Sequence, residues 1–280
     1  MEMIDHLMDV LLPLEALRFG FMKHALLAVL LLTPLLGLLG TMAVNKQMAF
    51  FSDALGHSAL TGIGLGIVLG IRSDLLAMLI FGVIWALLII LIRHKAQTSA
   101  DTVISVCSST SVAFGLVILS RGGGFAKYSS LLIGDILAVT PNDLLLLLLA
   151  LVLGSGLWMY MYNGLLLTSI NDSLAHSRGV RTRVLECAFA VLVAIIVMLS
   201  IRWVGMMLIN ALLILPAAAA RNLARSSRQH ACLSVLFALV SGITGLFSAY
   251  SWNTSAGAAI VIYAAALYTI SLLLKGKIKG

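Results

Sequence analysis

The stretch LLAMLIFGVIWALLIILI, residues 75–92, decides the fold class of this chain. It contains no charged residue, and a helix of about 20 such residues crosses the roughly 30 Å hydrocarbon core of a bilayer. Over all 280 residues, 61% are apolar and 10% are charged, whereas a soluble domain has about 25% charged residues. A water-soluble fold of this length could not bury so much apolar surface, so we expect an integral membrane protein.

Similar apolar windows recur along the whole chain. Each must be an α-helix, because unpaired backbone groups cannot face lipid and no segment shows the period-two alternation of a barrel strand. The predicted fold is therefore all-α, a polytopic membrane protein with about eight or nine transmembrane helices. The predicted spans are approximately 25–44, 52–71, 75–92, 103–120, 144–162, 184–201, 203–220, 231–249 and 256–274. The count falls to eight if 52–71 enters the membrane as a broken helix.

The net charge of +7 resides in short basic clusters between the apolar windows. Such clusters are typical of topology signals on the cytoplasmic side, not of one basic face that binds nucleic acid. With nine spans, an outside N-terminus and an inside C-terminus, all of these clusters are cytoplasmic. We expect an amphipathic N-terminal segment over residues 1–23 and a cytoplasmic loop over residues 163–183. The three cysteines are isolated, which disfavours disulfides and thiolate metal sites.

The segment FSDALGHSALTGIGLGIVLG, residues 51–70, carries the first candidate site. An ionised aspartate at mid-bilayer costs about 2.5–3.5 kcal/mol on insertion scales, so Asp53 needs a reason to be there. Residues four apart on a helix point the same way, so Asp53 and His57 could converge on one ion. An oxygen and an imidazole nitrogen suit Zn²⁺ or Mn²⁺. Alternatively, Asp53 caps a helix that begins at Ser52, and a neighbouring helix satisfies His57.

Glycines follow this pair on the same segment, at Gly62, Gly64, Gly66 and Gly70. Small residues let helices approach closely or let a solute pass near the backbone, and we favour packing.

Five segments resemble one family, the membrane permease subunits of bacterial ABC importers for zinc and manganese. SDALGHSALTGIGLG resembles the family's Asp-x-x-x-His segment. The other four segments are DTVISVCSSTSVAFGLVILS (101–120), LLIGDILAVTPNDL (131–144), WVGMMLINALLILPAAAARNLARS (203–226) and SAGAAIVIYAAALY (255–268). The resemblance covers residues from about 20 to 275 and places Asp53 and His57 on the family's metal-coordinating positions.

The resemblance implies a single transmembrane permease domain over residues 1–280, with a fold like that of type II ABC importers. It implies a homodimer in the bacterial plasma membrane, two cytoplasmic ATPase subunits below it and an extracytoplasmic metal-binding protein above it. The chain itself has no G-x-x-x-x-G-K-[ST] phosphate loop, so it cannot hydrolyse ATP and is not expected to be an enzyme. We expect no prosthetic group, only a transported divalent metal and ATP used by the partner subunit.

The cytoplasmic segment SINDSLAHSRGVRTR, residues 169–183, is the expected contact with the ATPase. Asp172 or Ser173 could cap a short helix there, and Gly179 would end it. The resemblance puts the family's coupling helix here, with Leu174, Ala175 and Gly179 at matching places. Without the resemblance, a plain solvated loop would be the better interpretation.

Three further polar residues have weaker cases. Asn210, in the window 203–220, could bond across the dimer or line the metal path, and we favour packing. Asp135 could serve as a gate or an electrostatic lure, or could merely cap a short external helix. Glu186 is expected to pair with Arg183 or to remain at the interface.

The sequence gives two signals on the identity of the metal. The segment GDILAVTPNDL, residues 134–144, is nearer to the zinc branch, but some zinc permeases carry a histidine where this chain has Ser108, Ser109 and Thr110. A manganese or iron permease of the same family is the alternative. An ion-driven secondary transporter would need more buried titratable groups and often an inverted repeat. A membrane scaffold or sensor is a third option, against which the glycine-rich, sparsely charged helices argue weakly.

Overall fold

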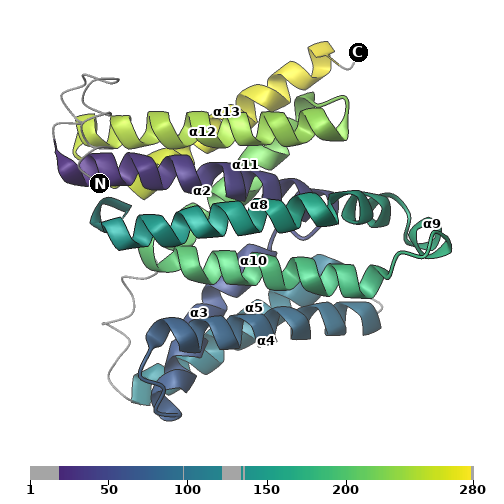
Figure 1. The fold of residues 1–280 in the computed structure, drawn as a ribbon, viewed down its shortest axis with the longest axis horizontal. Helices are drawn as coiled ribbons and strands as arrows, with labels where there is room; N and C mark the ends of the chain where they lie inside the picture. The colour runs from purple at the N-terminus through teal and green to yellow at the C-terminus, as the bar shows by residue number, and fades with distance from the viewer. Residues whose placement is uncertain (1–18, 97, 122–133, 135, 279–280) are drawn as a thin grey trace. The chain divides into compact units, whose positions relative to one another are not determined.

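The computed structural model describes residues 19–96, 98–121, 134 and 136–278, which form helices joined by short connections and contain no strand (Figure 1). This confirms the predicted all-α class. The helices are α2 (Gly20–Asn45), α3 (Phe51–Val68), α4 (Asp74–Lys95), α5 (Ala100–Arg121), the 3-10 turn η2 (Ile136–Ala138), α8 (Pro141–Ile170), α9 (Asp172–Ser177), α10 (Thr182–Val204), α11 (Met206–Leu223), α12 (Ser227–Trp252) and α13 (Ala256–Ile278).

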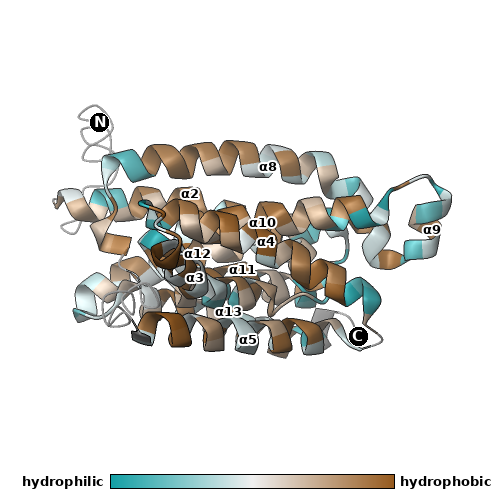
Figure 2. Ribbon diagram, turned by 90° about the horizontal axis from the view of Figure 1, so that it is seen from below, coloured by the Kyte–Doolittle hydropathy of each residue, from teal (hydrophilic) through white to brown (hydrophobic). Residues whose placement is uncertain are grey.

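Among these described helices, eight are long and apolar enough to cross a membrane: α2, α4, α5, α8 and α10–α13. Figure 2 shows apolar residues along the lengths of the helices and hydrophilic residues around α9. A helix with so apolar a surface requires lipid or other helices around it. The predicted class of polytopic membrane protein is confirmed.

The chain divides into two compact units. Unit 1 comprises Met1–Thr41, Ile133–Ser155 and Trp203–Gly280, and unit 2 comprises Met42–Leu132 and Gly156–Arg202. The prediction of one permease domain over residues 1–280 stays a prediction. Residues 1–18 of the expected amphipathic segment lie outside the described residues, and α2 begins at Gly20.

In unit 1, α11, α12 and α13 pack against one another in pairs. The buried Ser234 hydroxyl of α12 donates to the Gly37 carbonyl of α2 over 2.7 Å. The buried His230 ring places Nε2 2.9 Å from the Ala217 carbonyl of α11. These bonds satisfy polar groups where lipid offers no partner.

A glycine contact joins two of the segments that carry the family resemblance. Gly134 has φ +67°, and a Cβ at this position would overlap the backbone nitrogen of Gly205. Gly205 itself has φ +79° and is the N-cap of α11. Both positions therefore require glycine, for the backbone conformation and for the close approach.

In unit 2, α3 packs against both α4 and α5. The Thr61 hydroxyl of α3 donates to the Ser111 carbonyl of α5, and the Ser111 hydroxyl lies 3.1 Å from Thr61 Oγ1. A Cβ on Gly62 or Gly66 would press on α4, and one on Gly64 would lie 3.1 Å from Ile118 of α5. These three glycines thus serve helix packing, the role that was favoured for them, and Gly70 lies in the open turn after α3 with φ +72°.

Helix α3 is unbroken and runs the length of its neighbour α4. The last residues of α4, Arg93 and His94, form ion pairs with Glu186, and so does Lys46, just before α3. The start of α3 and the end of α4 therefore lie at the same end of unit 2. The 18 residues of α3 extend about 27 Å at 1.5 Å per residue. Helix α3 is not among the eight described helices that are long and apolar enough to cross a membrane, so the choice between eight and nine spans stays a prediction.

The α3–α4 contact predicts the outcome of a single methyl addition. In Gly66→Ala, the new Cβ would overlap the Ala77 Cβ, and such overpacking typically costs about 1–3 kcal/mol. The melting temperature of the purified protein in detergent should fall. Gly156→Ala is the matched control, because nothing lies within 4 Å of a Cβ there and alanine favours a helix over glycine. Equal melting temperatures for both variants would contradict the packing.

Candidate functional site

The start of α3 determines where Asp53 lies. The helix begins at Phe51, its N-cap residue is Phe50, and no side chain caps it. The alternative in which Asp53 caps a helix beginning at Ser52 is therefore wrong. Asp53 is the third residue of the helix, where the partial positive charge of the N-terminus favours a carboxylate.

Asp53 and His57 form the open strip of α3. From Phe51 to Gly64, every residue is buried except these two. The Asp53 side chain is 42% exposed and the His57 side chain 31% exposed. Between Phe51 and Gly64, α3 is thus open only at the two residues whose side chains are of metal-ligating types, whereas its last turn is exposed.

The two side chains are also close enough to share an ion. His57 Nε2 lies 3.6 Å from Asp53 Oδ2, which is too long for a hydrogen bond. Two ligands at about 2.1 Å from a tetrahedral ion are separated by about 3.4 Å. A small side-chain adjustment would bring both atoms onto one cation.

The pair does not by itself complete a coordination shell. No group of three or more histidine, cysteine or acidic residues that could hold a metal occurs in the described part of the chain. The remaining ligand positions would fall to water, hydroxyl oxygens or a second copy of the chain. Such a site is suited to brief binding, whereas a structural zinc site has four protein ligands.

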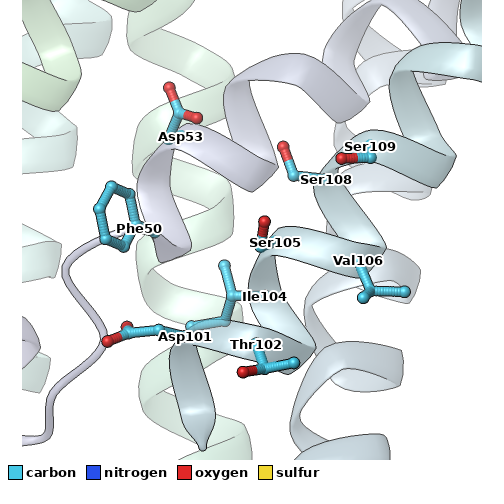
Figure 3. Close-up of a pocket in the computed structure, with 9 residues that line it drawn as sticks. All are labelled: Phe50, Asp53, Asp101, Thr102, Ile104, Ser105, Val106, Ser108 and Ser109. Carbon is cyan, nitrogen blue, oxygen red and sulfur yellow. The ribbon is translucent and has the colours of Figure 1, made fainter.

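A recess of about 660 Å³ lies beside Asp53, and polar residues of α5 line it. Figure 3 shows Phe50 and Asp53 at the start of α3, and Ser105, Ser108 and other lining side chains on α5. The lining residues are Phe50, Asp53, Asp101, Thr102, Ile104, Ser105, Val106, Ser108 and Ser109. The serine and threonine hydroxyls, together with the carboxylates of Asp53 and Asp101, make this recess polar. The serine-rich run 108–111 was the sequence signal for this polar face.

Helix α9 holds the residues expected to contact the ATPase. Its N-cap is Asn171, whose side chain accepts from Leu174 N over 3.1 Å, so neither Asp172 nor Ser173 is the cap. Gly179, with φ +77°, ends the helix as predicted, and Val180 N donates to Ala175 O over 3.0 Å in a Schellman-type closure.

The same short helix brings the predicted coupling residues together. Ala175 is fully buried, whereas Leu174 is 44% exposed, and Asp172 and Gly179 are exposed. A second recess of about 660 Å³ lies between α9 and the start of α10. Its lining residues include Asp172, His176 and Arg181. Ala175 thus anchors α9 against the rest of the chain, while Leu174 faces outward.

Two further candidate residues are Asn210 and Asp135. Asn210 is half-buried on α11, which belongs to unit 1, whereas Asp53 and His57 belong to unit 2. Asp135 lies outside the described residues.

A buried ionic cluster in unit 2 was not foreseen. Glu186 pairs with Lys46, with His94 Nε2 at 3.0 Å and with Arg93 Nη1 at 3.9 Å. Its partners are therefore not the expected Arg183. The only signal in the sequence was a carboxylate near the start of the apolar window 184–201, because the partners come from residues far away along the chain.

The eight long apolar helices of the described residues define a polytopic membrane protein. The sequence model of the ABC 3 transport family matches residues 18–275, and the chain belongs to this family. It is thus a multi-pass protein of the bacterial plasma membrane and a transport subunit, not an enzyme.

Relatives with curated names support this assignment. The chain is 29% identical to the high-affinity zinc uptake system membrane protein ZnuB of Haemophilus influenzae, covering 91% of this chain and 97% of that protein. It is 30% identical to the manganese import system permease protein ScaB of Streptococcus parasanguinis, covering 93% and 92%. The structure of PsaBC from Streptococcus pneumoniae in complex with Fab matches with a TM-score of 0.78 and 28% identity, covering 97% of this chain and 95% of that one.

The open strip of α3 predicts a labelling pattern. In a background without Cys107, Cys187 and Cys232, His57→Cys should react with a water-soluble maleimide, because this position is 31% exposed. Ser58→Cys should stay unlabelled, because Ser58 is fully buried. Labelling of the folded protein in membranes measures both, and reaction at equal rates would contradict the enclosed helix.

Proposed function

We propose that this chain is the permease subunit of an ATP-driven importer for a divalent transition-metal cation. Asp53 and His57 would ligate the cation in transit. The observation that carries this proposal is the open strip of α3, where a carboxylate and an imidazole lie 3.6 Å apart and every other residue from Phe51 to Gly64 is buried. The names of the zinc and manganese relatives support the same class of cargo.

Two protein ligands are suited to a site that must release its ion. Affinity depends on the number and geometry of the ligands, so a site completed by water binds less tightly than a closed protein shell. The hydroxyls of Ser105, Ser108 and Ser109 line the recess next to Asp53. They would replace part of the water shell of the ion as it passes, and loss of one ligand on helix movement would release it.

The energy would come from a partner ATPase, because the chain has no phosphate-binding loop. Helix α9 is the proposed contact, with Leu174 as its exposed apolar residue and Ala175 as its buried anchor. Asp172 begins α9 and Gly179 follows its end, so the two residues lie on either side of this contact. An extracytoplasmic metal-binding protein and a second copy of the chain would complete the transporter.

Zinc is the favoured cargo. The segment GDILAVTPNDL is similar to the zinc branch, and an imidazole ligand suits Zn²⁺. Manganese is the alternative, because the recess beside Asp53 is lined by carboxylate and hydroxyl oxygens, which suit Mn²⁺. Iron carried by the same site is a variant of this alternative.

Removing the charge of Asp53 should stop transport. In proteoliposomes that hold the whole transporter, Asp53→Asn should lower the rate of zinc uptake at least tenfold, because the cation loses its anionic ligand. Subunit assembly and basal ATPase activity should persist. Asp74→Asn is the matched control, because Asp74 also lies in the first turn of a helix but far from the pair.

The same assay tests the cargo. An excess of manganese should compete with zinc uptake less well than an equal excess of unlabelled zinc. Normal uptake by Asp53→Asn would refute the site, and stronger competition by manganese would reassign the cargo.

A further inference from the structure

The buried ionic cluster lies between the two parts of the proposed machinery. Lys46 directly follows the end of α2, and Glu186 lies near the start of α10. The exposed fraction is 2% for the Lys46 side chain and 5% for that of Glu186. We propose that the Lys46–Glu186 ion pair transmits movement of α9 to the Asp53–His57 pair, so that both are positioning residues. This inference rests on the proposed function, because it takes α9 as the ATPase contact and Asp53 as a metal ligand.

On the side of the ATPase, Glu186 is close to α9 along the chain. Gly179 ends α9, and α10 begins at Thr182, only three residues later. The closure of α9 onto Val180 leaves little slack in this connection. A displacement of α9 by a partner would therefore move the first turns of α10, and Glu186 with them.

On the side of the metal site, Lys46 is close to Asp53. The turn between α2 and α3 is tight, because Gln47 has φ +56° and Met48 N donates to Ala43 O over 2.9 Å. Phe51 N then donates to Met48 O over 3.1 Å. Movement of Lys46 would thus be carried into the first turn of α3, which holds Asp53.

A second contact braces the same turn. Arg93 Nη1 lies 3.2 Å from Met48 Sδ and 3.9 Å from Glu186 Oε2. The other Glu186 oxygen pairs with Lys46. One carboxylate therefore ties the end of α2, the end of α4 and the start of α10 together.

Burial makes this link all-or-none. Separating a buried ion pair strongly destabilises the protein, because it leaves each charge buried without its partner. Lys46 therefore cannot stay in place while Glu186 moves away. The pair either moves as one body or breaks, and an element with two discrete arrangements can couple distant sites. The cations Lys46 and Arg93 outnumber the single carboxylate even when His94 is neutral, so loss of Glu186 would also leave repulsion beside the α2–α3 turn.

The test uses the whole transporter in nanodiscs, and it measures metal affinity with and without ATP under conditions that block hydrolysis. In the parent protein, ATP should change the zinc affinity by a factor on the order of 5–150, as is usual for allosteric coupling. In Glu186→Gln, the basal ATPase rate should be kept, while the factor by which ATP changes the zinc affinity should fall below about twofold. Arg183→Gln is the matched control, since Arg183 is exposed on the same helix start.

A paired variant protects the test against misfolding. Lys46→Met with Glu186→Met removes both charges at once, which often leaves stability unchanged. The double variant should have the melting temperature of the parent and should still lose the effect of ATP on zinc affinity. This loss should not exceed the loss in a variant that carries only one of the two substitutions. An unchanged effect of ATP in this stable double variant would overturn the inference. If Asp53→Asn keeps the zinc affinity of the parent, the proposed function fails. If Asp53→Asn loses zinc affinity but the Glu186 variants respond to ATP like the parent, only the role inferred for the Lys46–Glu186 pair fails.

Discussion

Hydrocarbon offers no hydrogen bonds to a polypeptide, and this constraint governs both the backbone and the polar side chains of the chain. The backbone responds by forming helices throughout the described residues. Buried side chains respond by pairing, as Thr61 does with Ser111 and Ser234 with the Gly37 carbonyl. Against this background, Asp53 and His57 stand out, because both side chains stay part-exposed within a stretch of α3 whose other residues are buried.

The same helix packing that encloses α3 also fixes the place of its open strip. Three glycines let α4 and α5 approach α3 closely, so the first turns of α3 cannot easily rotate. The turn before them is held by buried ion pairs and a tight backbone connection. The proposed site is therefore a part-exposed pair on a packed helix, and its two protein ligands would bind a cation without trapping it.

Much of the fold could be predicted, because apolar length is a local property. The window 75–92 lies within Asp74–Lys95, and 103–120 lies within Ala100–Arg121. The proximity of Asp53 and His57 also followed from helical spacing alone. The boundaries were less accurate: the window 144–162 is part of a helix of 30 residues that continues beyond the expected hydrocarbon depth.

The predictions were wrong where the partner of a residue depends on tertiary contacts, or where neighbouring residues are equally suited to the same role. Glu186 was assigned to Arg183 by proximity in sequence, but its partner Lys46 is 140 residues away. Asn171 was passed over as the cap of α9 in favour of Asp172, because adjacent residues of both types are good caps. The side of α5 that lines the recess depends on which side of that helix packs against α3. Hydroxyl residues occur all around α5, so its sequence alone does not show which side this is.

X-ray absorption at the zinc edge tests the central claim most directly, on the permease–ATPase complex purified without its metal-binding protein. A first shell of nitrogen and oxygen atoms at about 2.0–2.2 Å is expected, with an imidazole signature that disappears in His57→Gln. A sulfur shell at about 2.3 Å, or an imidazole signature that survives this substitution, would contradict the account.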